Sequence, residues 1–203
     1  MCSPLLANVY LHWFDRAVYA EQGPVKWAKV ELIRYADDFV LLCRKVTPRL
    51  EGFVTEKLEQ WLGLKINREK TRTFEVKASA SGLDFLGYNF RLAPSPYGPK
   101  VRYWRIAPSK KSVHREIARL REMVSNRQHH IPIPVLIGRI NLQLRGWKAY
   151  YGQWHCGAAM QKINWHLENR LRRHLRRRSQ RPWRVPKGST LAAQLTKLGL
   201  ERL

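Results

Sequence analysis

Apolar residues follow a mixed pattern in the first half of the chain, where some segments have helical spacing and others have strand-like runs. Residues 3–20 are expected to form a helix whose apolar face holds Leu6, Val9 or Tyr10, Trp13 and Ala17. Residues 30–44 contain two β-type apolar runs around a short polar centre. This pattern predicts a hairpin with residues 36–38 at its tip.

The next segment begins with a helix signal and then breaks into short apolar runs. Thr47 followed by Pro48 predicts the start of a helix that ends near Trp61. Short strands are expected after that helix, at residues 64–66, 71–76, 85–90 and 101–106. The Pro and Gly residues of segment 94–99 predict the loop between the last two strands.

After Pro108 the apolar spacing is helical throughout. Residues 109–125, 133–151 and 160–178 each carry an apolar residue at every third or fourth position, and a short helix is expected after Ser189. The predicted fold class is therefore α+β. Antiparallel strands with helices are expected over residues 1–107, followed by an all-α basic bundle over residues 108–203.

Charge is distributed unevenly along the 203 residues. The chain carries 38 Lys and Arg against 15 Asp and Glu, a formal net charge of +23. Residues 1–100 hold 15 basic and 11 acidic residues, whereas residues 101–203 hold 23 basic and 4 acidic residues. A basic half in which Trp and Tyr are interleaved with Arg is typical of proteins that bind nucleic acid. A merely soluble, highly charged surface is the alternative interpretation.

Other classes of protein and site find little support in the sequence. No run approaches the roughly 18 uncharged apolar residues of a membrane span, so no membrane partner is expected. The three cysteines lack zinc-ligand spacing, and the scarcity of cysteine fits a reducing cytoplasm. The histidines have no metal-ligand spacing either, and His155, His166 and His174 in the basic helices are candidates for phosphate contact.

The sharpest local feature is the sequence Tyr35-Ala36-Asp37-Asp38 at the tip of the predicted hairpin. Two adjacent carboxylates between buried strands are costly unless they are hydrated or bound to a cation. Mg²⁺ prefers carboxylates together with substrate phosphates and water, so the pair is a candidate magnesium site. An Asp pair at a tight turn is also ordinary turn chemistry, and the pair alone leaves both interpretations open.

The surroundings of this pair resemble a known family. Four stretches resemble, in order, the later motifs of group II intron reverse transcriptases: SPLLANVYLHWFD at 3–15, RYADDFVLLCR at 34–44, LGLKINREKT at 62–71 and LDFLGYNF at 83–90. The thumb and maturase region of those proteins is similar to APSKKSVHREIARL at 107–120 and INLQLRGWKAYYG at 140–152. The resemblance implies a partial polymerase palm over residues 1–107 and a helical thumb and maturase region over residues 108–203.

The resemblance also implies a polymerase metal site at the hairpin tip. Asp37 would be a direct Mg²⁺ ligand and Asp38 its supporting neighbour, with Tyr35 and Ala36 near the primer end. In such enzymes two Mg²⁺ ions activate the primer hydroxyl and stabilise the leaving pyrophosphate. Lys70 matches the lysine that is a candidate for protonating the pyrophosphate, and a solvated surface lysine is an equally good interpretation.

Three more residues match positions around the primer and nucleotide. Leu86 and Gly87 match the Leu-Gly turn that supports the primer strand, and a glycine there lets another backbone approach closely. Asn8 is a candidate polar contact in the pocket for template and nucleotide.

The expected metal site is incomplete in this chain. The family takes a further metal-binding aspartate from a strand upstream of the Ser-Pro-Leu-Leu motif, within which this sequence begins. Asp15 does not obviously replace it, because it lies three helical turns along the motif helix. The sequence is therefore expected to be a fragment of an RNA-directed DNA polymerase, a nucleotidyltransferase, that does not polymerise DNA alone. A DNA primer or target and deoxynucleotides would be partners of the full-length enzyme.

RNA binding is the second function that the resemblance implies, with group II intron RNA as the partner. Basic side chains would contact phosphates, and exposed aromatic rings would stack on unpaired bases. The candidate contacts are Lys110, Lys111, Arg115, Arg119, Arg139, Arg145, Lys148, Tyr150, Arg172, Arg173, Arg176 and Arg177. Trp147 and Tyr151 lie on the apolar stripe and are expected to pack in the core.

Two functional classes remain open at this point. The first is a reverse transcriptase with a maturase role in intron splicing and mobility, in a prokaryotic-type cytoplasm and associated with the nucleoid through nucleic acid. The second is a non-catalytic RNA-binding splicing cofactor. Replacing Asp37 and Asp38 by Ala separates them, because only the polymerase activity depends on the carboxylates. A general DNA-binding domain is disfavoured by the lack of helix-turn-helix or zinc-finger spacing.

Overall fold

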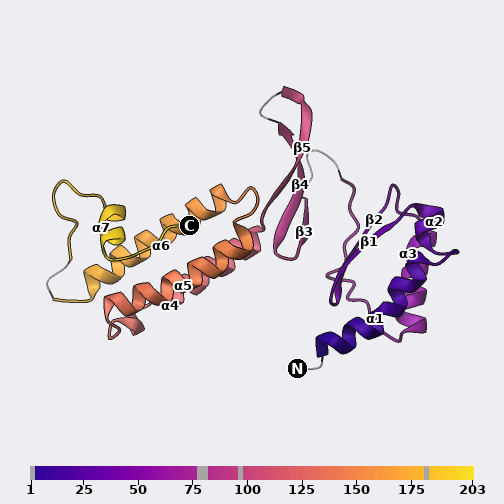
Figure 1. Cartoon of the computed structure of the whole chain (residues 1–203), viewed down its shortest axis with the longest axis horizontal. Helices are drawn as coiled ribbons and strands as arrows, with labels where there is room; N and C mark the ends of the chain where they lie inside the picture. Colours follow the sequence, from indigo (N-terminus) through magenta and orange to yellow (C-terminus); the bar gives the residue numbers. More distant parts are fainter. Residues whose placement is uncertain (1–2, 77–81, 96–97, 181–182) are drawn as a thin grey trace. The chain divides into compact units, whose positions relative to one another are not determined.

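The computed structural model describes residues 3–76, 82–95, 98–180 and 183–203, and the chain forms two compact units, residues 1–74 and residues 75–203. The elements of the first unit are α1 (Ser3–Tyr19), α2 (Pro24–Ala28), β1 (Glu31–Tyr35), β2 (Asp38–Leu42), α3 (Pro48–Thr55) and a π-helical segment (Glu56–Trp61). The elements of the second are β3 (Leu83–Phe85), β4 (Tyr88–Ser95), β5 (Gly98–Pro108), α4 (Lys110–Met123), a 3₁₀ turn (Asn126–Gln128), α5 (Ile133–Tyr151), α6 (Gly157–Arg177) and α7 (Leu191–Lys197). Figure 1 shows this order along the chain.

The first unit buries one face of α1 against the hairpin of β1 and β2 and the helical segment that follows it. Its core consists of Leu11, Phe14, Val18, Leu32, Leu58 and Leu62. The predicted apolar face of this helix is wrong, because Leu6 is 63% and Val9 61% exposed. Apolar residues surround most of α1, so periodicity alone does not select the side that packs. The helix thus keeps a second, exposed apolar side.

The predicted helix start at Thr47 is confirmed. The Thr47 hydroxyl accepts the backbone N–H of Leu50 at 3.3 Å, and Pro48 occupies the first turn, where its missing N–H costs nothing. The helical path ends at Trp61 as expected, although its last six residues adopt π-helical geometry. Gly63, with a φ of +62°, follows this end.

Three of the expected strands differ in the structure. Residues 64–66 and 71–76 form no strand, and within the described parts of the chain neither segment pairs with an edge of the two-stranded sheet of β1 and β2. Leu64 and Ile66 pack instead against the core of the first unit. The expected strand 85–90 is two strands separated by a tight turn.

The second unit begins with a three-stranded antiparallel sheet in the order β3-β4-β5. Tyr88 pairs with Pro108 at one end of the β4–β5 ladder, and Ser95 pairs with Gly98 at the other. The hairpin loop predicted at 94–99 is shorter than expected, and its residues 96–97 lie outside the described residues. Helix α4 follows the sheet directly. Ser109, the residue after β5, caps this helix, and its hydroxyl accepts the N–H of Ser112 at 3.1 Å.

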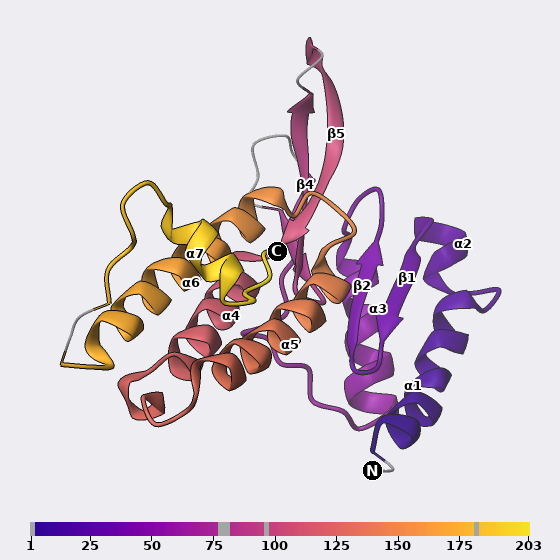
Figure 2. The ribbon, with the colours of Figure 1, turned by 60° about the vertical axis from the view of Figure 1, so that its left-hand side comes forward.

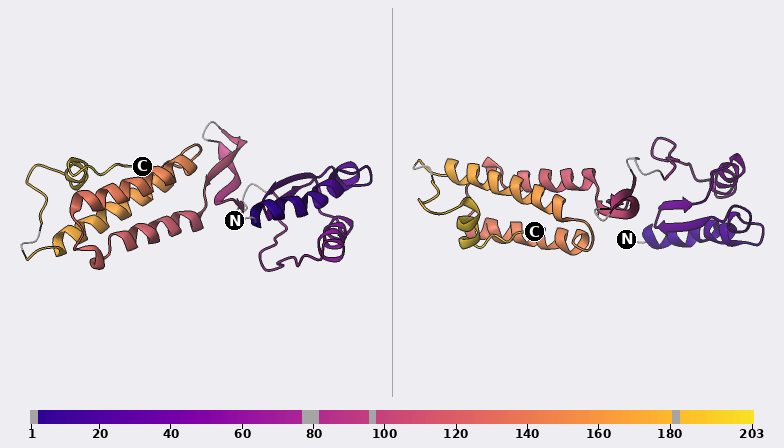
Figure 3. Two further views of the ribbon diagram at one scale, coloured as in Figure 1. Left: turned by 60° about the horizontal axis from the view of Figure 1, so that its bottom comes forward. Right: turned by 90° about the horizontal axis from the view of Figure 1, so that it is seen from above.

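Helices α4, α5 and α6 lie side by side and form the main core of the second unit (Figure 2). Their predicted apolar stripes are confirmed, with Ile140, Ile163 and Leu171 almost fully buried between them. Trp147 is 6% exposed and Tyr151 packs against the same cluster, as the apolar spacing predicts. Figure 3 shows the three helices from two further directions, with α7 against the bundle.

The compact units divide earlier in the chain than the expected domain boundary after residue 107. The turn between β3 and β4 and the start of α4 are joined by hydrogen bonds, so the sheet belongs to the second compact unit. The assignment of residues 1–107 and 108–203 to separate functional regions stays a prediction. None of the described helices combines the length and apolar character needed to cross a membrane.

Candidate functional site

The Tyr-Ala-Asp-Asp sequence forms the turn of the hairpin between β1 and β2. Tyr35 pairs with Asp38 as the last ladder pair, which leaves Ala36 and Asp37 as the two turn residues. Ala36 has a φ of +52°, a left-handed conformation that a non-glycine residue adopts at a cost of about 1–2 kcal/mol. Asp37 and Asp38 are both exposed, so their carboxylates are accessible to solvent and ligands.

Arg34 holds this turn to α1. Its guanidinium donates to both carboxylate oxygens of Asp15, with Nε–Oδ1 at 2.9 Å and a second nitrogen, Nη2, 2.6 Å from Oδ2. The other terminal nitrogen, Nη1, donates to the carbonyl of Ala36 and to Oδ1 of Asn8, each at 2.9 Å. Asn8 and Asp15, which lie in the same motif at residues 3–15, thus both bind one arginine of the next motif, and the sequence did not single out that arginine.

The two aspartates of the turn offer part of a magnesium site. Adjacent exposed carboxylates suit Mg²⁺, which takes one or two protein carboxylates and completes its shell with water and substrate phosphates. Within the described residues no third Asp, Glu, His or Cys joins a group that would hold a metal. Asp15 is occupied by Arg34, so this carboxylate is already paired with a cation. The carboxylates of Asp37 and Asp38 therefore fit a metal ion whose other ligands are water and substrate phosphates.

Lys70 lies outside the regular elements of the first unit. It is exposed, and its backbone N–H donates to the carbonyl of Asn67 at 3.1 Å in a turn. The side-chain oxygen of Asn67 also accepts the Lys70 N–H, at 3.2 Å, which fixes the backbone of the turn. Both the catalytic and the surface interpretation of this lysine remain compatible with an exposed position.

The Leu86–Gly87 turn between β3 and β4 is held by the helices of the second unit. Both residues have positive φ, +49° at Leu86 and +80° at Gly87. The Leu86 carbonyl accepts the Tyr150 hydroxyl at 3.0 Å, and the Gly87 carbonyl accepts the Ser112 hydroxyl at 2.9 Å. A Cβ on Gly87 would lie 2.4 Å from the Tyr151 hydroxyl. The close approach at Gly87 is therefore made by side chains of α4 and α5 and not, as expected, by another backbone.

Tyr150 combines a structural contact with an exposed ring. It is 52% exposed, and its hydroxyl is committed to Leu86. The hydroxyl of Tyr88 in turn donates to the Tyr150 carbonyl, and the two rings lie 5.7 Å apart between centroids. Tyr88 and Tyr151 therefore both pack against this partly exposed ring.

All the basic candidates of the second unit are exposed, but they lie on more than one side of the bundle. Lys111, Arg115 and Arg119 repeat every four residues along α4 and share one side of it. On α5 the candidates divide. Arg139 shares by spacing the side of Gln143, whereas Arg145 donates to Glu201 near the C-terminal end of the chain.

Lys148 lies three residues after Arg145 on α5, and its charge helps to lower the pKa of Glu201, after the direct effect of Arg145. Lys148 and Arg145 therefore belong to the side of α5 that faces the C-terminal segment. On α4, Lys110 is exposed at the start of the helix, as are Lys111, Arg115 and Arg119 further along it.

A cluster of arginines joins the ends of α4 and α6, and sequence analysis identified only part of it. Burial first, and then the positive charges of Arg121, Arg173 and Arg177, lower the pKa of Arg170. Nε of Arg170 is buried without a hydrogen-bond partner in the described structure. Such a concentration of like charge is costly in the free protein and favours binding of an anion. Arg172 and Arg176 are exposed on the same helix.

The arginine cluster contains two residues, Arg121 and Arg170, that were not among the candidates predicted from the sequence. Arg121 and Arg170 were missed because each lies in a separate helix among many other basic residues. Helical spacing groups residues within one helix only. It does not show that α4 and α6 lie side by side.

Comparison with known proteins gives two matches. Residues 1–90 match the reverse transcriptase (RNA-dependent DNA polymerase) family, and residues 110–189 match the maturase-specific domain of group II introns. The first match contains the Asp37–Asp38 turn and the Leu86–Gly87 turn, and the second contains α4, α5 and α6. No curated protein matches the chain.

Proposed function

Because the chain belongs to the group II intron reverse transcriptase and maturase family, we propose that it combines part of an RNA-directed DNA polymerase site with an RNA-binding helical unit. The observation that carries this proposal is the exposed Asp37–Asp38 turn, held in place by Arg34. The helical unit supplies a second activity, the binding of intron RNA in splicing.

The aspartates of the turn would hold Mg²⁺ together with phosphates of the substrate. Bound there, the metal supplies positive charge that stabilises the pyrophosphate leaving group and activates the primer hydroxyl. Asp37 lies in the two-residue turn and Asp38 is the first residue of β2, and Arg34 binds the carbonyl of Ala36, the other turn residue. Lys70 is a candidate proton donor to the pyrophosphate.

Primer extension on an RNA template with Mg²⁺ tests the polymerase part. We expect a preparation of this chain alone to be inactive, because within the described residues only two carboxylates come together at the turn. Extension by this chain alone would overturn that expectation. In a form that also carries the third carboxylate, Asp37→Asn is expected to abolish extension, and retained activity would remove Asp37 from the metal site.

The second candidate function, a splicing cofactor without polymerase activity, is favoured by the arginine cluster around Arg170. Its test is RNA binding by the chain at several salt concentrations. If about 6 phosphates are contacted, the logarithm of the binding constant should fall with the logarithm of salt concentration with a slope near −4. Binding that does not change with salt would contradict phosphate contacts. A chain that binds and assists splicing after Asp37→Asn would support the cofactor role.

A further inference from the structure

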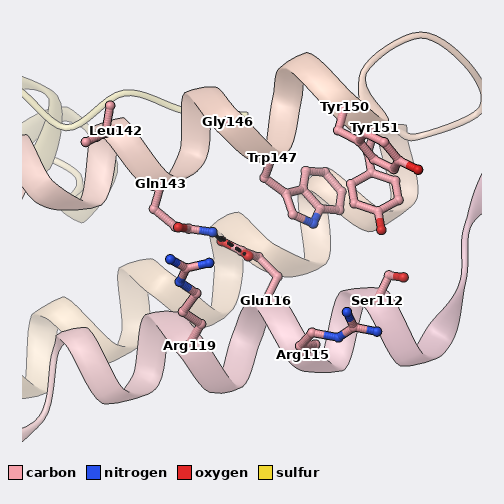
Figure 4. A pocket seen from close by; sticks show the side chains of 10 residues that line it. All are labelled: Ser112, Arg115, Glu116, Arg119, Leu142, Gln143, Gly146, Trp147, Tyr150 and Tyr151. Carbon is pink, nitrogen blue, oxygen red and sulfur yellow. Dashed lines mark hydrogen bonds between the residues drawn. The ribbon is translucent and has the colours of Figure 1, made fainter. Parts of the chain in front are cut away.

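A pocket of about 320 Å³ opens between α4 and α5 in the second unit. Figure 4 shows its lining, with Glu116 and Gln143 facing each other, Trp147 beside them, and Arg115 and Arg119 on α4. The volume is within the range of small-ligand sites. Its lining combines aromatic rings, two guanidinium groups and one carboxylate.

Two buried polar groups in this pocket lack a full set of partners. Glu116 is 5% exposed, and its two carboxylate oxygens share a single donor, Nε2 of Gln143, at 2.9 and 3.1 Å. A carboxylate can accept about four hydrogen bonds, so each oxygen has acceptor capacity left. Burial raises the pKa of Glu116, whereas Gln143 and the charge of Arg119 act in the opposite direction.

Trp147 provides the complementary group. Its side chain is buried, and Nε1 has no hydrogen-bond partner in the described structure. Figure 4 shows the ring nitrogen of Trp147 pointing toward α4, on the side where Glu116 lies. A buried indole N–H without an acceptor is uncommon in folded proteins. The pocket therefore contains a hydrogen-bond donor without a partner, Nε1 of Trp147. It also contains the two carboxylate oxygens of Glu116, which can each accept a further hydrogen bond.

We propose that this pocket binds one unpaired guanine base of a single-stranded RNA. Guanine carries two adjacent N–H donors on its Watson–Crick edge, which match the two oxygens of Glu116, and it carries acceptors that match the Trp147 N–H. Cytosine and adenine offer one amino group on that edge, and uracil offers one N–H. Arg115 and Arg119, both exposed, lie where they can contact the flanking phosphates.

This inference rests on the proposed RNA binding by the helical unit and adds its base preference. The probes are short fluorescent oligouridines with one central guanosine, adenosine, uridine or inosine, bound to the whole chain at fixed salt. The guanosine probe is expected to bind about tenfold more tightly than the uridine probe. Inosine lacks the amino group and is expected to lose most of that advantage, which tests the pocket without altering the protein.

The variant Glu116→Gln replaces one acceptor by a donor at nearly constant shape. It is expected to remove the guanosine preference while the salt dependence of binding to plain oligouridine stays unchanged. Glu122→Gln, an exposed carboxylate on the same helix, is the matched control and should keep the preference. Equal affinity for all four probes in the unaltered chain would overturn the proposal that this pocket binds guanine. A full guanosine preference in Glu116→Gln would overturn it as well. The absence of salt-dependent binding to any probe would overturn RNA binding itself.

Discussion

Arg34 on β1 and Asp15 on α1 form a partly buried ion pair directly behind the turn that carries Asp37 and Asp38. The side chains of the pair are 15% and 25% exposed. Because the same guanidinium also binds the Ala36 carbonyl, the pair connects the helix to the turn. The left-handed conformation of Ala36 is thus supported by Arg34 of the same hairpin, which Asp15 of α1 holds in place.

Replacing Asp15 by Asn should loosen the turn as well as the pair. We expect Asp15→Asn to lower the free energy of unfolding by about 1.5–3 kcal/mol, because a charged hydrogen-bond partner is removed. Amide hydrogen exchange at residues 36–38 should become faster. Glu21→Gln, an exposed carboxylate of the same unit, is the control. Unchanged exchange at the turn in Asp15→Asn would show that Arg34 does not position it.

Gly87→Ala should destabilise the second unit for two separable reasons. The left-handed φ of +80° costs about 1–2 kcal/mol for alanine, and the new Cβ would meet the Tyr151 hydroxyl at 2.4 Å. Gly188 has nearly the same φ, +78°, and no atom within 4 Å of such a Cβ. Gly188→Ala therefore measures the backbone cost alone, and Gly87→Ala should lose about 1–3 kcal/mol more in urea unfolding.

The double variant Gly87→Ala with Tyr151→Phe tests the clash itself. Without the hydroxyl, the nearest Tyr151 atom would be Cζ at 3.4 Å, which is ordinary van der Waals distance. Part of the extra loss of stability should therefore be recovered. Equal losses at Gly87 and Gly188 would mean that the turn moves away from α5 without cost.

The helices of the second unit were predictable because their spacing is local. Ile163, Leu167 and Leu171 repeat every four residues in α6, whose other positions are mostly polar or charged, so only one face can pack. The opposite holds for α1, where apolar residues surround the helix and the packed side depends on what the hairpin offers. The strands expected at 64–66 and 71–76 failed for a similar reason, because a strand needs a partner that its own sequence does not specify.

The residues of the candidate site could be predicted from sequence motifs, but the tertiary contacts that hold them could not. The Asp37–Asp38 pair is adjacent in sequence, and its place at a hairpin tip follows from the flanking apolar runs. Arg34 and Asp15 are 19 residues apart, and Tyr150 and Leu86 are 64 apart, so their contacts depend on tertiary packing. The same is true of the pocket at Glu116, because a buried glutamate in a helix is not distinguishable from an exposed one by composition.

The arginine cluster predicts opposite effects on stability and on binding. Arg173→Gln with Arg177→Gln removes two charges that repel Arg170, so the free energy of unfolding should rise by a few tenths of a kcal/mol. RNA affinity should fall, and the salt slope should become shallower by about 0.7 for each phosphate that the variant no longer neutralises. Lys187→Gln with Lys197→Gln, at two exposed cations outside the cluster, removes the same net charge and is the control. Unchanged affinity and slope would place RNA on another side of the bundle.

His174 makes the second unit sensitive to acid. Its side chain is 2% exposed and packs against His129, with ring centroids 4.4 Å apart, so the expected phosphate contact is wrong. Burial first, and then the nearby His129 and Arg178, lower the pKa of His174 in the folded protein, although the carbonyls of Val124 and Ser125 act in the opposite direction. The folded chain therefore binds a proton at this ring less readily than the unfolded chain.

The direction of the pH effect follows from this difference. Above about pH 6.5, the ordinary pKa of histidine, the ring is neutral in both states and stability does not depend on it. As the pH falls below that value the unfolded chain takes up the proton first, so the second unit should lose up to about 1.4 kcal/mol for each pH unit until the folded pKa is reached. Urea unfolding at pH 7.5 and at pH 5 measures this loss. His174→Phe should remove most of it, because a ring of similar size fills the site without titrating, whereas His114→Gln at an exposed position of α4 should leave it in place. A loss that persists in His174→Phe would assign the acid sensitivity to other groups, and the contact between His174 and His129 would then be a packing contact alone.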